Sequence, residues 1–151
     1  MKKLLCLILV VSIFCIFPNV QAEECRDRTE TLIHLENGEY IVVEIVQKTS
    51  RAIYSQSGSK SYTFYGSDNV AKWQAVLNGT YIYTGSSSTC TAASCDVTIF
   101  DGNYYLISKN ASRSGNAAYG TATVGRKILG ITHDQNTINL TLTCDVNGNL
   151  S

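Results

Sequence analysis

Hydrophobic and polar positions alternate in short runs along most of the chain, and the first two runs predict a β-hairpin. Residues 32–36 and 39–46 are rich in Leu, Ile, Val and Tyr, and they flank Asn37-Gly38. Asn-Gly between two β-type runs is typical of a two-residue hairpin turn, because both turn positions need a positive φ. Such a turn pairs Leu35 with Tyr40. One face of the hairpin is then expected to be buried, with Ile33, Leu35, Tyr40, Val42 and Val46.

Clusters of Gly, Ser, Asp and Asn recur downstream and predict turns between further strands. They lie at residues 57–59, 66–69, 85–88, 101–103, 114–116 and 134–136. The run after the last cluster alternates strictly, so its buried face is predicted to hold Ile138, Leu140, Leu142 and Cys144. Between residues 71 and 84, Asn78-Gly79 indicates either a second hairpin or a bulge in one long strand. We favour the bulged strand.

The pattern as a whole predicts an all-β fold. No helical period of useful length occurs after residue 22. Short strands with regular turns are typical of a sandwich or barrel, so we expect an antiparallel β-sandwich of about seven to nine strands. A chain of 151 residues accommodates one such domain, which we assign to residues 31–151.

The first 22 residues have the order of a secretory signal peptide. Lys2 and Lys3 precede an apolar run over residues 4–17, and Val20-Gln21-Ala22 forms a small-x-small cleavage signal. The apolar run is shorter than the roughly 20 residues that a membrane-spanning helix needs. We therefore predict a cleavable hydrophobic signal helix at residues 1–22, a secreted, extracellular protein, and no stable membrane anchor after cleavage.

Removal of the predicted signal peptide changes the charge balance. The full chain has 12 Lys+Arg and 12 Asp+Glu, and loss of Lys2 and Lys3 leaves a formal net charge of −2. A slightly acidic protein without a basic stripe is not expected to bind nucleic acid, which requires cations that replace counterions. Residues 23–30 then form a charged lead-in to the β domain.

Four cysteines remain after the predicted cleavage, Cys25, Cys90, Cys95 and Cys144. An even set in an exported chain predicts two disulfides. The spacing contains no CxxC pair and no nearby histidine, so we predict no metal site. We favour Cys90–Cys144, which closes a long loop, together with Cys25–Cys95, which ties down the start of the mature chain. The local pair Cys90–Cys95 is left open.

The sequence offers no recognisable catalytic machinery and no cofactor motif. It lacks G-x-S-x-G, a phosphate loop and a dinucleotide fingerprint. The two histidines, His34 and His133, belong to no motif, and most aspartates after the lead-in lie at predicted turns. We therefore expect a protein that is not an enzyme and has no catalytic residues.

Aromatic residues are the best candidates for ligand binding. Trp73, Tyr81 and Tyr83 share one face of the predicted long strand, and flat rings on a sheet stack against sugars. Tyr62, Tyr65, Tyr104 and Tyr105 are further members of the set. The same rings also fill sandwich cores, which is the more frequent use. The basic pair Arg126-Lys127 is interpreted as a solvated strand edge.

From Lys60 onward the chain resembles a group of small secreted bacterial proteins rich in Ser and Thr. The resemblance lies in SKSYTFY (59–65), GTYIY (79–83), CTAAS (90–94), GRKILG (125–130) and LTCDVNGNLS (142–151). It implies a secreted β protein with cysteines at the positions of Cys90 and Cys144, which favours that pairing. Cys25 and Cys95 are additions relative to the group, which favours pairing these two. The resemblance implies no activity.

These features favour a non-catalytic extracellular module that binds a glycan, a cell-envelope polymer or a protein. Such a module is expected to expose an aromatic strip. A small secreted effector, such as an antimicrobial or an inhibitor, is the alternative, and it needs an accessible rigid loop near Cys90 or Cys95. A hydrolase is a third hypothesis, and it requires Asp, Glu or His side chains that converge in one cleft.

Overall fold

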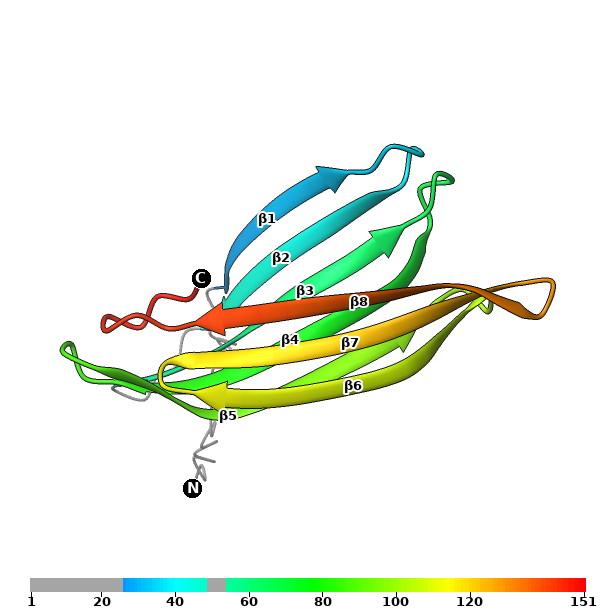
Figure 1. The fold of residues 1–151 in the computed structure, drawn as a ribbon. Helices are drawn as coiled ribbons and strands as arrows, with labels where there is room; N and C mark the ends of the chain where they lie inside the picture. The colour runs from blue at the N-terminus through cyan, green and yellow to red at the C-terminus, as the bar shows by residue number, and fades with distance from the viewer. Residues whose placement is uncertain (1–25, 49–53) are drawn as a thin grey trace, which may run out of the picture.

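The computed structural model describes residues 26–48 and 54–151, which form eight antiparallel strands in two sheets (Figure 1). The strands are β1 (Arg26–His34), β2 (Tyr40–Lys48), β3 (Ser55–Tyr65), β4 (Ala71–Tyr83), β5 (Ser88–Ile99), β6 (Tyr104–Ser114), β7 (Ala117–Ile128) and β8 (Ile131–Thr143). The first sheet has the order β1-β2-β3-β4-β5, and the second has β6-β7-β8. The predicted all-β antiparallel fold is confirmed, with a strand number inside the expected range. The predicted signal peptide lies outside the described residues.

One hydrophobic core lies between the sheets. Both sheets contribute to it, the first mainly through Trp73, Leu77 and Tyr81 of β4, and the second through β7 and β8. The predicted alternation of β8 is confirmed, because Ile138, Leu140, Leu142 and Cys144 are all buried. Side chains from alternate positions of facing strands thus form the contact between the two layers.

Residues 71–83 form one long strand, as favoured from the sequence, but the expected bulge at Gly79 is wrong. Gly79 pairs with Gly58 of β3 and Ala93 of β5, and the extra residue near Tyr81 is Thr91 of β5. Gly79 is needed because the ring of Tyr81 lies over it. A Cβ at Gly79 would lie 2.7 Å from Cζ of Tyr81. The glycine therefore makes room for the fully buried tyrosine of the core.

The first hairpin differs from the prediction by one residue. The turn is closed by the Leu35 amide, which donates to the Glu39 carbonyl at 2.9 Å, so three residues form the loop, with Gly38 at φ 75°. His34 consequently pairs with Tyr40. A shift of one position exchanges the two faces of a strand. Ile41 is buried in the core instead of Tyr40.

Two predicted turns are strand interiors. Ser57-Gly58-Ser59 lies within β3, and residues 134–136 lie within β8. The turn between β7 and β8 is at Leu129-Gly130, where both residues have positive φ, 53° and 81°. Ser, Asn and Asp are common in these strands because one face of each is solvated, and this composition imitates a turn signal.

The five-stranded sheet extends beyond its partner on one side (Figure 1). β8 packs over β3 and β4, whereas β1 makes close backbone contacts with β2 alone among the described strands. β1 is thus an edge strand that the second sheet does not cover.

Candidate functional site

Four turns meet at one end of the molecule, on the right in Figure 1. They connect β1 to β2, β3 to β4, β5 to β6 and β7 to β8, because every odd-numbered strand runs toward this end. A cleft of about 510 Å³ lies there. Its lining is mostly polar, and its charged residues are Glu39, Asp68, Lys72, Asp101, Arg126 and Lys127. We call this space the end cleft.

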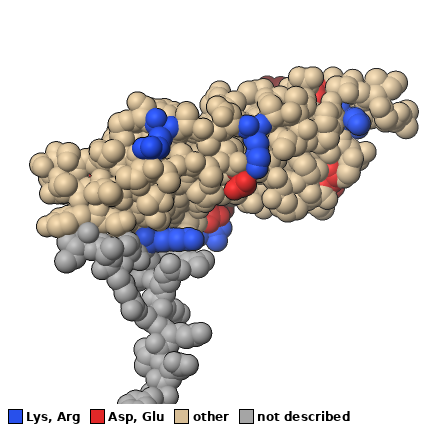
Figure 2. All heavy atoms as spheres, turned by 90° about the horizontal axis from the view of Figure 1, so that it is seen from below, with Lys and Arg blue, Asp and Glu red and all other residues tan. Residues whose placement is uncertain are grey.

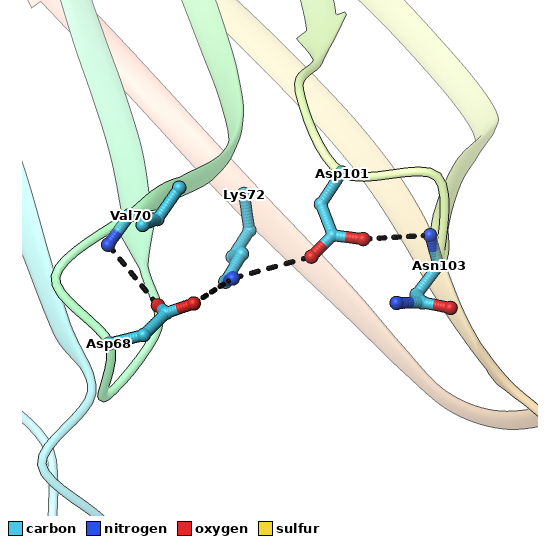
Figure 3. A network of polar contacts seen from close by, with 5 residues as sticks. All are labelled: Asp68, Val70, Lys72, Asp101 and Asn103. Atoms are coloured by element: carbon cyan, nitrogen blue, oxygen red, sulfur yellow. Dashed lines mark hydrogen bonds and ion pairs between the residues drawn. The ribbon is translucent and has the colours of Figure 1, made fainter.

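Lys72 is the central cation of one wall (Figure 3). Its Nζ lies 2.6 Å from Oδ2 of Asp68 and 3.3 Å from Oδ2 of Asp101. Only 14 % of its side chain is exposed. The Lys72 carbonyl also accepts the amides of Phe100 and Asp101, at 2.9 and 3.1 Å. Lys72 therefore joins the β3–β4 turn to the β5–β6 turn through both its side chain and its main chain.

The two aspartates are fixed by their own turns as well as by Lys72. Oδ1 of Asp68 accepts the Val70 amide at 3.2 Å, and Oδ1 of Asp101 accepts the Asn103 amide at 2.9 Å (Figure 3). The Lys72 hydrogen bond lowers the pKa of Asp68, and the Asn103 amide, followed by Lys72, lowers the pKa of Asp101. The hydrogen bond to Asp68 raises the pKa of Lys72. All three groups are held in their charged forms.

The second sheet supplies the opposite wall, with Tyr104 of β6 and Arg126 of β7. Cζ of Arg126 lies 5.8 Å from the centroid of the Tyr104 ring. Burial raises the pKa of Tyr104, so its hydroxyl stays protonated and available as a donor. The Lys127 amide donates to the Asn103 carbonyl at 2.7 Å, which holds the β5–β6 turn against β7.

A smaller cavity of about 180 Å³ continues from the end cleft toward the core. It shares Glu39, Tyr104 and Arg126 with the larger space. Its other lining residues combine apolar side chains with polar ones, and they are Leu35, Phe64, Trp73, Val124, Asp134 and Asn136. The site therefore has a polar mouth and an inner part with aromatic walls.

Arg126 lies where the two spaces meet. Within the described residues its side chain has no hydrogen-bond or ion-pair partner, although Asp134 is its register partner on β8. Arg126 follows the buried Val124 by two positions on β7, so it faces the interior. Because β7 is the central strand of its sheet, the interpretation of Arg126-Lys127 as a solvated strand edge is wrong, although Lys127 is exposed. The alternation from Val124 to Arg126 could have indicated that Arg126 faces the interior. Lys72 gave no comparable signal in the sequence.

The structure does not bring the predicted aromatic platform together on the surface. Trp73 is 1 % exposed and Tyr81 is 0 % exposed, so neither ring can stack on a ligand at the surface. Tyr83 is half-buried and packs edge-on against Tyr54, with ring centroids 6.1 Å apart. Of these three residues only Trp73 reaches the candidate site, as part of the inner cavity wall, and Tyr104 of the wider aromatic set lines both spaces.

The predicted disulfide cysteines lie away from the end cleft. Cys90, Cys95 and Cys144 are buried free thiols in this structure, so Cys90–Cys144 is not bonded here and stays a prediction. The Cys90 amide donates to Gly115 and the Cys144 amide to Asn116, at 2.8 and 3.1 Å, which places both cysteines beside the β6–β7 turn. In the other predicted pair, Cys25 lies outside the described residues.

Figure 2 shows that charged side chains are sparse on the face seen from below, without a broad patch of one sign.

Comparison of the chain with protein-family models, with curated proteins and with solved structures finds no match. In residues 26–48 and 54–151 there is no helix of the length and hydropathy needed to cross a membrane. The end cleft is thus the feature from which a function can be inferred.

Proposed function

We propose that the protein is a secreted, non-catalytic binding module with a β-sandwich scaffold, and that the end cleft binds a glycan. One observation carries this proposal. Arg126, with no partner among the described side chains, lies beside the Tyr104 ring at the junction of a polar mouth and an aromatic-walled inner cavity.

The size and lining of the cleft support a small polar ligand. A volume of about 510 Å³ lies in the range of small-molecule sites, roughly 300–1,000 Å³. The Tyr104 ring offers a flat apolar surface, while Arg126, Glu39 and Asn136 offer donors and acceptors beside it. Sugar rings present hydroxyl groups at their edges and an apolar face, which matches this combination.

The charges support an uncharged ligand over an ionic one. Lys72 is neutralised by Asp68 and Asp101. Arg126 and Lys127 form no ion pair among the described residues, but the three cationic side chains that line the end cleft are matched in number by three carboxylates, those of Glu39, Asp68 and Asp101. The hydroxyl groups of a neutral ligand can accept hydrogen bonds from the cationic side chains and donate them to the carboxylates. Hydrogen bonds to charged side chains are stronger than those between neutral groups.

The two aspartates bound to Lys72 are not suited to acid catalysis. A glycoside hydrolase needs one carboxylic acid that is protonated at working pH beside a second that is ionised. Asp68 and Asp101 both bind Lys72, and the pKa of each is lowered. This pair holds no proton to deliver at neutral pH.

The test is retention of the protein on a panel of immobilised glycans and cell-envelope polysaccharides, followed by calorimetry with the best ligand. Arg126→Gln removes the charge and keeps much of the side-chain length, and we expect about tenfold weaker binding or more. Lys109→Gln is the matched control, because Lys109 pairs with Asp96 on another surface. Equal affinity of Arg126→Gln and wild type, or no binding to any glycan of the panel, contradicts the proposal.

A further inference from the structure

β1 is one of the two edge strands of the five-stranded sheet, and β5 is the other. β1 pairs with β2 along its whole length, and its other edge has no strand partner among the described residues. All side chains from Asp27 to His34 are exposed, with Leu32 at 50 % and Ile33 at 44 %. A long edge strand presents unpaired N–H and C=O groups, which are a template for another strand.

The charges of β1 are self-complementary in one antiparallel register. Arg28 and Glu30 lie two positions apart and so on the same face, 3.1 Å from Nη2 to Oε2. Both are well exposed, at 59 % and 50 % of their side chains, and Nη2 of Arg28 also lies 3.1 Å from Oε2 of Glu44 on β2. If a second β1 runs antiparallel with a two-fold axis at Thr29, each Arg28 lies opposite Glu30 of the other copy. An axis at Glu30 would instead place two glutamates opposite each other, which is unfavourable.

We propose that two copies of this protein associate through β1, in antiparallel register about Thr29, and join their five-stranded sheets into one. A second copy is the expected partner because Arg28 and Glu30 lie on the same strand, so two β1 strands in this register place opposite charges against each other. A two-fold interface uses the same patch on both subunits and consumes both free β1 edges. Association through β1 therefore stops at the dimer. This inference does not depend on the end cleft.

Sedimentation velocity over a range of concentrations tests the dimer, with protein produced from the full-length chain. We expect reversible dimerisation that weakens with salt, because the cross-strand pairs are exposed. Arg28→Glu and Glu30→Arg should each weaken self-association about tenfold, because two attractive pairs become repulsive. Lys109→Glu, a charge reversal on β6, should leave it unchanged.

Mixing the two single variants distinguishes an interface effect from misfolding. One variant then carries glutamate at both charged positions of β1 and the other carries arginine at both, so the mixture should form a heterodimer with near-wild-type affinity. The double variant R28E/E30R should also dimerise. A monomer at every concentration, single variants that dimerise like wild type, or a mixture that stays monomeric would overturn the proposal.

A cysteine scan tests the register. Thr29→Cys places two thiols opposite each other at the two-fold axis, so it should cross-link into a dimer under mild oxidation. Thr31→Cys is the matched control, since its position faces Asp27 of the other copy and its thiols lie farther apart. Equal cross-linking of the two variants would contradict the axis at Thr29.

Discussion

The hydroxyl of Tyr81 donates a hydrogen bond to the main-chain carbonyl of Leu142 across the core, at 2.6 Å. Tyr81 belongs to β4 and Leu142 to β8, so this bond joins the two sheets. Both residues are 0 % exposed. The tyrosine predicted as a ligand contact is therefore a structural element that connects the layers.

Replacement of Tyr81 by Phe should destabilise the fold without creating a large cavity. The Leu142 carbonyl would remain buried without this donor, which costs about 1–3 kcal/mol in the free energy of unfolding. Equilibrium unfolding in urea measures this change. Tyr83→Phe is the control, because Tyr83 is only half-buried, and it should change stability by less than about 0.5 kcal/mol. Similar losses in both variants would show that the Tyr81 bond is not the cause.

Two glycines covered by tyrosine rings should respond differently to substitution by alanine. At Gly79 the added Cβ meets the buried Tyr81 ring, whose hydroxyl is fixed to Leu142, so we expect a loss of about 1–3 kcal/mol. At Gly125 it meets Tyr105 at 2.7 Å, a ring on the outer face that can turn toward solvent. Gly125→Ala should therefore cost less. Thermal and urea unfolding of both variants measure the difference, and a larger loss at Gly125 would contradict this account.

The sequence predicted the strands whose faces differ sharply in polarity, such as β8 with Ile138, Leu140 and Leu142. The prediction was wrong where the residue types common in turns are also common in solvated strands, as at Ser57-Gly58-Ser59. The predicted register of the first hairpin was displaced by one position. A glycine with positive φ, as at Gly38, is found in three-residue loops as well as in two-residue turns.

Much less of the candidate site was predictable. Lys72 and Arg126 belong to different sheets, and their proximity depends on which strands face each other. Local patterns do not contain that information. The aromatic residues failed as a predicted platform for a related reason, since Trp73 has the same sequence signature in a core as on a surface. Asp101 was recognised only as a turn residue, and it is also a partner of Lys72.

Acid should weaken the fold through the Lys72 network. The pKa values of Asp68 and Asp101 are lowered in the folded state. The two carboxylates therefore contribute to the free energy of unfolding above their unfolded pKa of 3.8, and this contribution is lost as pH falls through the lower folded values. Lys72→Met removes the partner of both carboxylates. We expect its stability to fall less than that of wild type between about pH 5 and pH 2. Urea unfolding at a series of pH values measures this, and parallel curves for the two proteins would contradict the assignment.

Alkaline conditions should weaken the fold through the buried tyrosine. Burial raises the pKa of Tyr81 above the ordinary value of 10.0, so the folded state retains a proton that the unfolded state releases. Stability is then fully present below pH 10 and declines as pH rises above it. Tyr81→Phe should decline less steeply over that range. Equal slopes for the variant and wild type would show that other groups control alkaline unfolding.

The predicted disulfides are expected to form before the core closes. Burial raises the pKa of the Cys90, Cys95 and Cys144 thiols, and a protonated thiol attacks a disulfide slowly. Refolding of the reduced protein with oxidised glutathione should therefore yield the Cys90–Cys144 bond. In that reaction the two thiols lose two protons and two electrons to the glutathione disulfide. The same reagent added to the folded, reduced protein should act much more slowly.

Peptide mapping by mass spectrometry without reduction identifies the pairs. A Cys90–Cys144 cross-linked peptide, lighter than its two parts by two hydrogen atoms, is the expected product, and Cys25–Cys95 is its predicted companion. Cys90→Ser with Cys144→Ser is the control and should remove the first peptide alone. Because the two cysteines flank the β6–β7 turn, the bond should also slow exchange of the Cys90 and Cys144 amides, which donate to the carbonyls of Gly115 and Asn116. Complete alkylation of all four thiols after oxidative refolding, or a Cys90–Cys95 peptide, would contradict the predicted pairing.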